Sequence, residues 1–439
     1  MLRAMFRRVR RQCARRWHSM IPLSWLCRLP ANGDHNKMPP LLSPSDISSR
    51  SCTTTTTIFG LFVVSALLAL PPFVLALFLT GLADHFFETP FAQFRWSEAY
   101  VRAQVVRELL GSSHSSVANL LATDLQPLVP INPWPTLFPR PLIEPNCRHN
   151  ILSRHNSVLI IVKSAPDRRK HRDAVRATYG ALKRYPPASE APPAVPAPAV
   201  GTGGDTFFRL RTIFVLGRPA ADDAAQMNAL ESEAAAHGDL LVGDFMDTYF
   251  NNTLKFVHSV RFARHYCALP NSVPFVLLLD DDFLLFPWNL ITELQKHVPN
   301  ERLYMGWRFD TSPFRSRLFK WRVSLDEFPF AAFPPYIAAG AVLLTGQTIA
   351  EFYAAIPHVR LFRLDDIFAG ILSHLLAITP QHNANFAFYR QSFADDSLAL
   401  ASSETLTTLI AVHDYLPEEM RETYGKAVKQ QNQQKLKLL

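Results

Sequence analysis

The sequence predicts an α/β domain with a mainly parallel β-sheet, which follows one transmembrane helix and a stem. Three observations support this: an uncharged apolar stretch over residues 58–83, a proline-rich stretch before residue 146, and apolar runs that alternate with helical patterns beyond it. The chain has 439 residues, of which 48% are hydrophobic and 19% charged. Collagen-like, wholly disordered and small disulfide-rich proteins are therefore excluded.

The net charge of +8 comes from residues 1–57, a basic tail. This segment holds ten Lys or Arg residues against Asp34 and Asp46, and the remainder of the chain has 35 residues of each sign. A folded part with balanced charge has no general attraction for a polyanion, which disfavours a nucleic-acid binder that would work through the arginine tail alone. A basic tail beside an apolar span instead places the amino terminus in the cytosol.

Residues 58–83 are predicted to form a transmembrane signal anchor. Their 26 uncharged residues are long enough for a hydrocarbon layer of roughly 30 Å at about 1.5 Å per residue. Nearly sixty residues precede them, too many for a cleaved signal peptide. Pro71 and Pro72 would kink such a helix, and a buried core helix or a re-entrant hairpin is the alternative. The predicted topology is single-pass type II, with the part after Asp84 on the lumenal side.

Residues 84–146 are predicted to form a stem. Proline recurs through LQPLVPINPWPTLFPRPLIEPN too often for a helix or a central strand and favours an extended, semi-rigid spacer. A loop packed across the domain surface is the alternative. Only Cys147 and Cys267 lie beyond the predicted anchor and stem, and both a disulfide between them and two free thiols stay open.

Strands and helices alternate over residues 147–425, the predicted folded domain. Buried strands are expected at residues 158–162, 212–216, 240–245 and 275–279, and helices at residues 168–179, 222–237 and 252–266. Ligands of parallel sheets gather at the carboxyl ends of strands. Residues 186–204 have few large apolar side chains and are predicted to be a disordered insertion, and residues 426–439, rich in Gln and Lys, a flexible tail.

An acidic triplet ends the last of these strands. Asp280, Asp281 and Asp282 follow the apolar run FVLLL, and adjacent carboxylates repel one another unless a cation or strong donors neutralise them. On an extended strand, Asp280 and Asp282 project to one side and Asp281 to the other. Two oxygen ligands with free coordination positions suit magnesium or manganese bound to a diphosphate, whereas a solvated turn or a helix cap is the alternative.

Two further charged groups are candidates for chemistry. Asp365 and Asp366 open a predicted helix in RLDDIFAGILSHLL, where an acid often serves only as a cap stabilised by the helix dipole. Arg172 and Arg176 are four residues apart in SAPDRRKHRDAVRATYG and so share one helix face, as a phosphate clamp requires. Ordinary surface charge is the alternative for these arginines.

In their order, these segments resemble the motifs of the β-1,3-glycosyltransferase family, which includes β-1,3-galactosyltransferases, β-1,3-N-acetylglucosaminyltransferases and the Fringe enzymes. The segment RDAVRATYG resembles the basic motif of that family, DFMDTYFNNTLK the motif that follows it, and the acidic triplet its D-x-D motif. KWRVSLDEFPFAAFPPY, LDDIFAG and VHDYLPEEM are similar to three later motifs. The resemblance covers roughly residues 147–424.

The resemblance implies a Rossmann-like glycosyltransferase domain of the type A fold and an inverting, metal-dependent enzyme of the Golgi membrane. Such an enzyme would transfer galactose or N-acetylglucosamine from a UDP-sugar to the 3-hydroxyl of an acceptor glycan, carried by a glycolipid or a glycoprotein. By this similarity Asp280 and Asp282 hold manganese or magnesium, with His413 as a further ligand. Asp366 would be the general base, since inversion needs one base opposite the leaving UDP.

By the same similarity, the nucleotide side of the site would include Asp281 together with Arg172 and Arg176. Asp247 and Lys255 would belong to the same cleft, and a salt-bridged scaffold is an equal alternative for this pair. A catalytically inactive lumenal chaperone of the same fold is the rival function, which the intact metal ligands and base disfavour. The donor sugar, the acceptor and the oligomeric state stay open at this level.

Overall fold

The computed structural model describes residues 70–94, 105, 130–134, 140–146, 156–186, 207–266, 273–388 and 408–438. The chain divides into two compact units, residues 1–73 and residues 74–439. Only residues 70–73 of the first unit belong to the described part, so the strands and the sheet belong to the second unit.

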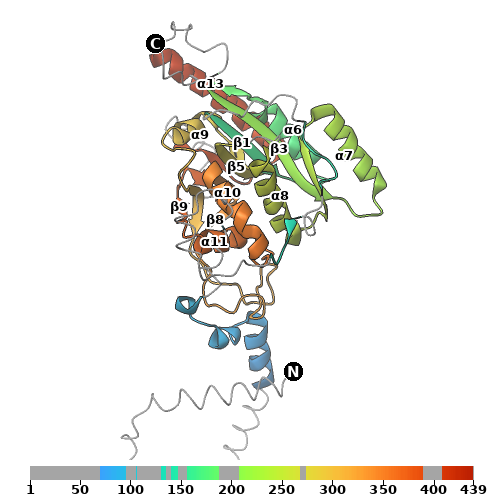
Figure 1. Ribbon diagram of the computed structural model, residues 1–439, viewed down its shortest axis with the longest axis vertical. Coiled ribbons are helices and arrows are strands. Elements are labelled where there is room, and N and C mark those ends of the chain that lie inside the picture. Colours follow the sequence, from blue (N-terminus) through green and yellow to red (C-terminus); the bar gives the residue numbers. More distant parts are fainter. Residues whose placement is uncertain are drawn as a thin grey trace, which may run out of the picture. The chain divides into compact units, whose positions relative to one another are not determined.

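A mixed sheet of eight strands forms the centre of the second unit (Figure 1). The order along the sheet is β2-β3-β1-β5-β8-β7-β9, and β4 also pairs with β3. The strands are β1 (Ser157–Lys163), β2 (Arg184–Tyr185), β3 (Phe208–Arg218), β4 (Leu240–Met246), β5 (Phe275–Asp280), β7 (Tyr304–Phe309), β8 (Tyr336–Thr345) and β9 (Gln381–His382). The four strands predicted from the sequence correspond to β1, β3, β4 and β5 and are confirmed.

Strand direction changes along this sheet. β1 is parallel to β3 and β5, and β4 is parallel to β3, as the alternation of strands and helices predicts. However, β8 is antiparallel to its neighbours β5 and β7, and β2 is antiparallel to β3. The predicted mainly parallel sheet is therefore a mixed one beyond β5, where β7 and β9 are the parallel pair among the described strands. No helix lies in the described loop between β7 and β8, and a parallel pair would need such a crossover.

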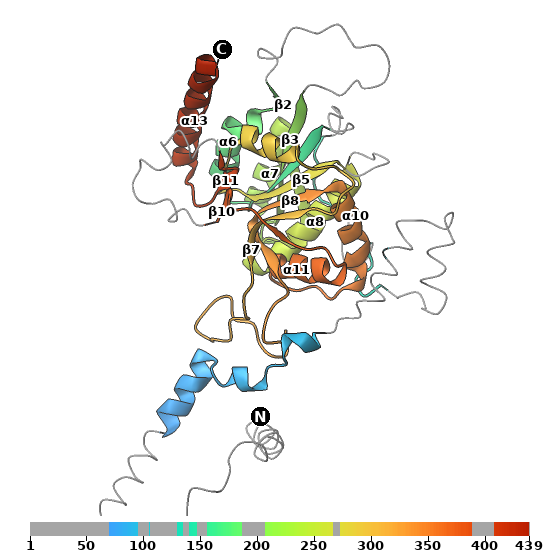
Figure 2. The same cartoon turned by 90° about the vertical axis from the view of Figure 1, so that its left-hand side faces the viewer.

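Helices cover both faces of the sheet. They are α6 (Arg169–Ala177), α7 (Ala224–His237), α8 (Asn252–Arg264), α9 (Pro287–Leu294), α10 (Gly346–Ala355), α11 (Asp365–Leu375) and α13 (Pro417–Leu438), with short 3₁₀ helices at Asp84–Phe87 and Phe91–Gln93. A second sheet is formed by β10 (Phe386–Ala387), β11 (Ala411–Val412) and β6 (Leu284–Leu285). Figure 2 shows α8, α10 and α11 together on one side of the large sheet.

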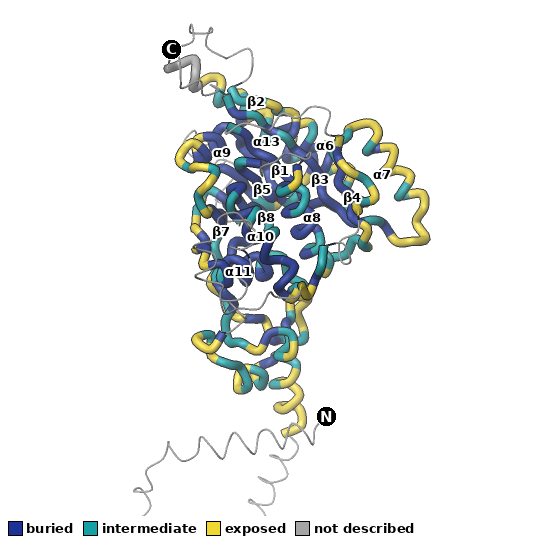
Figure 3. Tube along the Cα trace, viewed as in Figure 1, coloured by how far each residue is buried: buried dark blue, intermediate teal, exposed yellow. Residues whose placement is uncertain are grey.

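The core has two layers because successive side chains of a strand face opposite sides. All seven residues of β1 are buried, as expected for a strand between two layers. Leu159 and Ile161 belong to an apolar cluster with α8, α10 and α11, whereas Val158 and Ile160 belong to a second cluster with α6, α9 and α13. Figure 3 shows this buried centre in dark blue.

Several sequence predictions fall on residues outside the described part: the basic tail 1–57, nearly all of the insertion 186–204, and both Cys147 and Cys267. The predicted anchor at residues 58–83 is described only from residue 70 onwards, and residues 70–80 are helical. Within the described ranges, no helix combines the length and apolar character needed to cross a membrane.

The described parts of the predicted stem pack against the domain. The backbone N–H of Thr89 donates to the carbonyl of Pro329 over 2.8 Å, in the loop between β7 and β8. Phe94 is buried, and its ring lies against Phe328. These contacts match the alternative of a packed loop and differ from an extended spacer, because Phe91 and Phe94 bury apolar surface on the domain.

The chain ends in a long helix, α13, and differs here from the flexible tail predicted for residues 426–439. Met420 and Ala427 are buried, and Tyr424 and Val428 pack against the same apolar cluster. Their spacing of four, seven and eight residues places all four on one helix face. The run of Gln and Lys that follows Val428 favoured a solvated tail and hid this periodicity.

The packing of the stem gives a first testable prediction. Arg315 is buried, with its Nε atom 2.7 Å from Oε1 of Glu88. Glu88→Ala leaves this guanidinium buried without its carboxylate, so we expect the free energy of unfolding to fall by roughly 3 kcal/mol in chemical denaturation. Glu422→Ala, which breaks the exposed pair with Lys426, should change it by less than about 1 kcal/mol. Equal effects of the two substitutions would contradict a packed stem.

Candidate active site

The candidate site lies where the strand order of the large sheet reverses. β3 follows β1 on one side and β5 adjoins it on the other, so the carboxyl ends of β1 and β5 flank the crevice in which such sheets bind ligands. The register places Lys163, the last residue of β1, opposite Asp280, the last residue of β5. Asp365 and Asp366 reach the same place from the amino terminus of α11.

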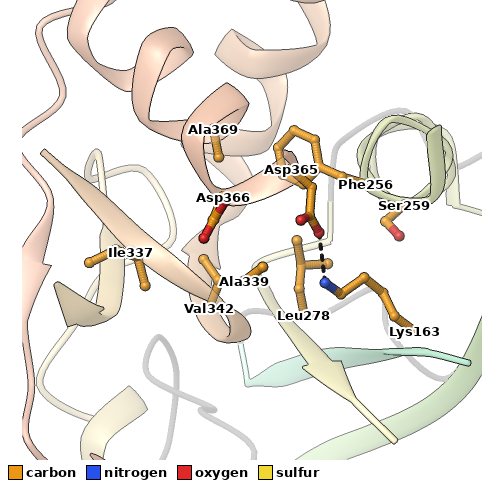
Figure 4. Close-up of a pocket in the computed structure, with 10 residues that line it drawn as sticks. All are labelled: Lys163, Phe256, Ser259, Leu278, Ile337, Ala339, Val342, Asp365, Asp366 and Ala369. Carbon is orange, nitrogen blue, oxygen red and sulfur yellow. Dashed lines mark hydrogen bonds and ion pairs between the residues drawn. The ribbon is translucent and has the colours of Figure 1, made fainter. Parts of the chain in front are cut away.

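Lys163 joins the two acidic groups. Its Nζ atom lies 3.0 Å from Oδ1 of Asp280 and 2.7 Å from Oδ2 of Asp365, and Figure 4 shows the second of these contacts. Burial would lower the pKa of Lys163, but Asp280 and Asp365 outweigh burial and raise that pKa above its usual value. The lysine is therefore a permanent positive charge between the acidic triplet and the start of α11.

Asp366 is the carboxyl group best placed to act as a base. Burial and the neighbouring charge of Asp365 raise the pKa of Asp366 to about 7. Its Oδ1 atom accepts a hydrogen bond of 2.8 Å from the N–H of Ile367, and its side chain lines a small cavity beside Ile337 of β8 (Figure 4). A carboxyl group with a pKa near neutrality can accept a proton at physiological pH and release it again.

Asp280 and Asp281 point to different surroundings, as the strand geometry predicts. Asp281 is buried and accepts hydrogen bonds from Oγ of Ser164 over 2.7 Å and from Nε of Arg168 over 2.8 Å. Its carboxylate is thus committed to the loop that leads into α6, which differs from the predicted contact with a nucleotide. Burial raises the pKa of Asp280 to about 6, although Lys163 opposes this rise.

Asp282 faces His413, which the second sheet brings to the triplet. Val412 of β11 pairs with Leu284 of β6, so His413 follows next to the triplet, and its Nε2 atom lies 3.6 Å from Oδ1 of Asp282. Burial alone would raise the pKa of Asp282, but His413 and Arg168 lower it below its usual value. Burial would lower the pKa of His413, and Asp282 raises it instead.

These groups have the chemistry of a divalent-cation site. The Oδ1 atom of Asp282 is buried and has no hydrogen-bond partner among the described residues. An unpartnered carboxylate oxygen beside an imidazole suits manganese or magnesium, whose remaining positions diphosphate oxygens and water can fill. Within the described ranges, no three His, Cys, Asp or Glu side chains are arranged to hold a metal ion as they stand. Asp280, the third predicted ligand, is paired with Lys163.

Arg172 and Arg176 do not form the predicted phosphate clamp. Arg172 is fully buried, with Nε and Nη2 each donating to Glu233 over 2.7 Å, and Arg176 donates to Glu233 and Asp239. Burial would raise the pKa of Glu233, but the two arginines lower it. The spacing of four residues does put both arginines on one face of α6, yet that face packs against α7, a neighbour that the spacing alone could not identify.

Arg168, one turn earlier, is the arginine that reaches the acidic triplet. Its Nη2 atom lies 2.6 Å from Oδ1 of Asp281 and 3.9 Å from Oδ2 of Asp282. The side chain is partly exposed, so it can also meet an anion that enters the site. Sequence reasoning missed this role and that of Lys163. The available signal for Lys163 was a single charge at the end of an otherwise apolar strand.

Asp247 and Lys255 form a buried scaffold behind the site. The Nζ atom of Lys255 lies 2.8 Å from Oδ1 of Asp247 and donates to the carbonyl of Ser164 over 2.7 Å. Oδ2 of Asp247 accepts a hydrogen bond of 2.8 Å from the N–H of Gly217. The pair therefore ties the ends of β1, β3 and β4 to α8, in agreement with the scaffold alternative.

An exposed aromatic group borders the site on the side of Asp366. Trp321 donates from Nε1 to the hydroxyl of Tyr249 over 2.8 Å, and the Nζ atom of Lys320 lies 5.1 Å from the centre of the Tyr249 ring. Burial raises the pKa of Tyr249, as does the charge of Asp366, while the hydrogen bond from Trp321 opposes them. Tyr249 is therefore close enough to Asp366 to sense its charge.

Known proteins are similar in sequence to this chain over much of its length. A family model described as galactosyltransferase matches residues 170–384. The beta-1,3-galactosyltransferase brn of Drosophila melanogaster is 34% identical over 272 residues, which cover 61% of this chain and 73% of that protein. The beta-1,3-galactosyltransferase bre-5 of Caenorhabditis elegans is 31% identical, covering 61% of this chain and 74% of that protein. The UDP-GlcNAc:betaGal beta-1,3-N-acetylglucosaminyltransferase 7 of Rattus norvegicus is 28% identical, covering 60% and 62%.

The two sets of arginines can be distinguished by nucleotide affinity. We expect Arg168→Gln to weaken the binding of uridine diphosphate about tenfold or more in calorimetry, because the site loses its exposed positive charge. Arg176→Gln should leave that affinity within about twofold, since this guanidinium faces Glu233 and Asp239. Thermal unfolding shows whether each variant is folded. An equal loss of affinity in both variants would support the phosphate-binding role predicted for Arg176.

Proposed function

Because the chain belongs to the β-1,3-glycosyltransferase family, we propose that it transfers galactose or N-acetylglucosamine from a UDP-sugar to the 3-hydroxyl of an acceptor glycan, with inversion at the transferred sugar. One observation carries this proposal: Asp366, a carboxyl group with a pKa near neutrality, lines the same cavity as Lys163 and Asp365, and Lys163 links Asp365 to Asp280 of the acidic triplet. The names of the relatives support both donor sugars. Of the three relatives named above, two are galactosyltransferases and one is an N-acetylglucosaminyltransferase.

Asp366 is the general base of the proposed reaction. It accepts the proton of the acceptor hydroxyl while that oxygen forms the bond to the sugar and the bond to UDP breaks. A pKa of about 7 suits this task, because a substantial share of the group is ionised at neutral pH and that form is still basic enough to attract the proton. The neighbouring Asp365 does not compete for the role, because its Oδ2 atom is bound to Lys163.

The donor side is formed by the acidic triplet. Asp282 and His413 would hold manganese or magnesium, with Asp280 as a further ligand. When bound, the cation would offset the negative charge that develops on the departing diphosphate. Arg168 lies at the same edge and contributes a second positive charge toward that diphosphate.

The acceptor side is formed by the exposed aromatic group of Tyr249 and Trp321. Tyr249 is near enough to Asp366 for its pKa to respond to that charge, and Trp321 and the ammonium of Lys320 contact Tyr249. Aromatic faces can cover the apolar face of a sugar ring, and Lys320 can donate to its hydroxyls. An acceptor bound there would present a hydroxyl to Asp366.

The proposed address is the Golgi membrane, with type II topology and a lumenal catalytic domain. The support is the uncharged stretch over residues 58–83 together with the seven arginines among the first sixteen residues. Glycolipid and glycoprotein glycans are the proposed acceptors, and the type A fold is the proposed architecture of the catalytic domain.

The transfer reaction is tested by UDP release from UDP-galactose and from UDP-N-acetylglucosamine over a panel of acceptor sugars. We expect one donor to be consumed, only with manganese or magnesium, and Asp282→Asn or Asp366→Asn to lower the rate about 1,000-fold. Asp244→Asn changes an exposed carboxylate paired with Arg218 and serves as the control, without loss of activity. UDP release that continues after the divalent cations are chelated would contradict the proposed metal dependence. No release from protein that still binds UDP would favour the inactive chaperone.

The pH profile tests the identity of the base. Because burial and Asp365 raise the pKa of Asp366 to about 7, kcat/KM should be low in acid, rise as pH increases through about 7, and level off above it. Asp365→Asn removes the neighbouring negative charge, so the rise should move to lower pH. Asp244→Asn should leave the midpoint in place. A rise near pH 4 in the unmodified protein would contradict a base whose pKa is raised to about 7.

A further inference from the structure

One surface of the second unit combines exposed apolar side chains with basic ones. It is formed by residues 74–86 and by loop residues 311–325, and we call it the apolar patch. Its exposed large side chains include Phe78, Leu82 and Phe86 from the first segment and Phe314, Leu318 and Phe319 from the second. Leu318 is 69% exposed and Phe86 is 79% exposed, which is unusual for side chains of this size in a group.

The two segments of the patch are fixed to each other. Arg317 donates from its backbone N–H to the carbonyl of Leu79 over 2.9 Å, and its guanidinium lies 3.2 Å from Asp84 and 3.8 Å from the centre of the Phe78 ring. Gly81 has a φ of +75°, and a Cβ atom there would meet the backbone of Arg315 at 2.4 Å. Glycine thus permits the close approach, and the patch is part of one packed structure.

The composition of the loop favours a lipid surface. The sequence TSPFRSRLFKWRVSL, residues 311–325, contains four basic residues and is followed by Asp326 and Glu327. Arg315 is paired with Glu88 and Arg317 with Asp84, whereas Lys320 is exposed beside the aromatic rings. Leucine, phenylalanine and tryptophan interleaved with lysine and arginine are typical of segments that lie in the interface of a bilayer with anionic lipids.

We propose that the apolar patch docks into the interfacial region of a lipid bilayer. The partner of the patch is a membrane, and not a second copy of the chain, because residues 74–80 lie in the last part of the uncharged stretch that begins at Ile58. The loop is bonded to the carbonyl of Leu79 near the end of that stretch, so an anchor formed by it would bring Leu318 and Phe319 to the bilayer surface. This placement rests on the proposed anchor.

Docking has a consequence for the active site. The rings of Phe314 and Trp321 are 6.1 Å apart, and Trp321 donates to Tyr249 on the side of Asp366. The patch is therefore continuous with the acceptor side. When the patch is docked, the bilayer lies next to the open side of the site. Packed residues, and not a flexible spacer, then set the distance between the two.

Photocrosslinking in the full chain tests this docking. The protein is placed in nanodiscs of phosphatidylcholine and phosphatidylserine, with p-benzoylphenylalanine in place of Leu318 or of Phe319. Val298→p-benzoylphenylalanine is the matched control. Val298 is also exposed, but it lies before β7 in the chain, at the opposite end of that strand from the loop. We expect lipid adducts at positions 318 and 319, detected by mass, roughly tenfold above those at position 298. Omitting phosphatidylserine should lower their yield.

The outcomes separate the docking from the proposed function. A chain that stays with the nanodiscs but gives no more adduct at 318 and 319 than at 298 overturns the docking alone. A chain that does not stay with the nanodiscs overturns both the docking and the anchor. Because the readout is a lipid adduct, it is independent of sugar transfer, and UDP release from the same nanodiscs reports separately on the reaction. Leu318→Asp combined with Phe319→Asp should abolish adducts from Phe314→p-benzoylphenylalanine while UDP release with a soluble acceptor persists.

Discussion

The buried ammonium of Lys163 is the interaction on which the candidate site depends. It stands at the end of β1 with Asp280 at 3.0 Å and Asp365 at 2.7 Å, and without it these carboxylates would repel each other in a poorly solvated place. The ammonium therefore determines how close the start of α11 can come to the end of β5. That separation fixes the relation between the proposed base and the acidic triplet, which belong to segments more than eighty residues apart in the sequence.

A second layer of buried ion pairs holds this arrangement from behind, and Ser164 is its common point. The hydroxyl of Ser164 donates to Asp281 and accepts from Arg172, and its carbonyl accepts from Lys255. Each cation has its own carboxylate: Arg168 has Asp281, Arg172 has Glu233, and Lys255 has Asp247. Removal of one partner would leave a buried charge unpaired, which costs several kcal/mol, so these pairs restrict the geometry of the loop after β1 more than they add to stability.

Local patterns in the sequence were enough for the elements that periodicity determines. The strands β1, β3, β4 and β5 and the start of α11 follow from apolar runs and an acidic helix start, and the alternation of Asp280 and Asp281 follows from strand geometry. The antiparallel direction of β8 could not be predicted, because it depends on which strands pair with β8 in the folded sheet. The same limit applies to Arg172 and Arg176, whose partners lie on α7 and beyond it, and to Lys163, whose role appears only when β1 and β5 are adjacent.

The loop between β7 and β8 connects two parts of the molecule that the sequence treats separately. Within a few residues it buries Arg315 against Glu88, exposes Leu318 and Phe319, and bonds Trp321 to Tyr249 beside the proposed base. Such a loop cannot move freely, because Arg315 also donates to two carbonyls of the loop itself, those of Val323 and Phe330. Because this connection is rigid, the position of residues 74–94 also determines the position of the proposed acceptor side. Residues 74–94 are thus part of the architecture of the proposed active site.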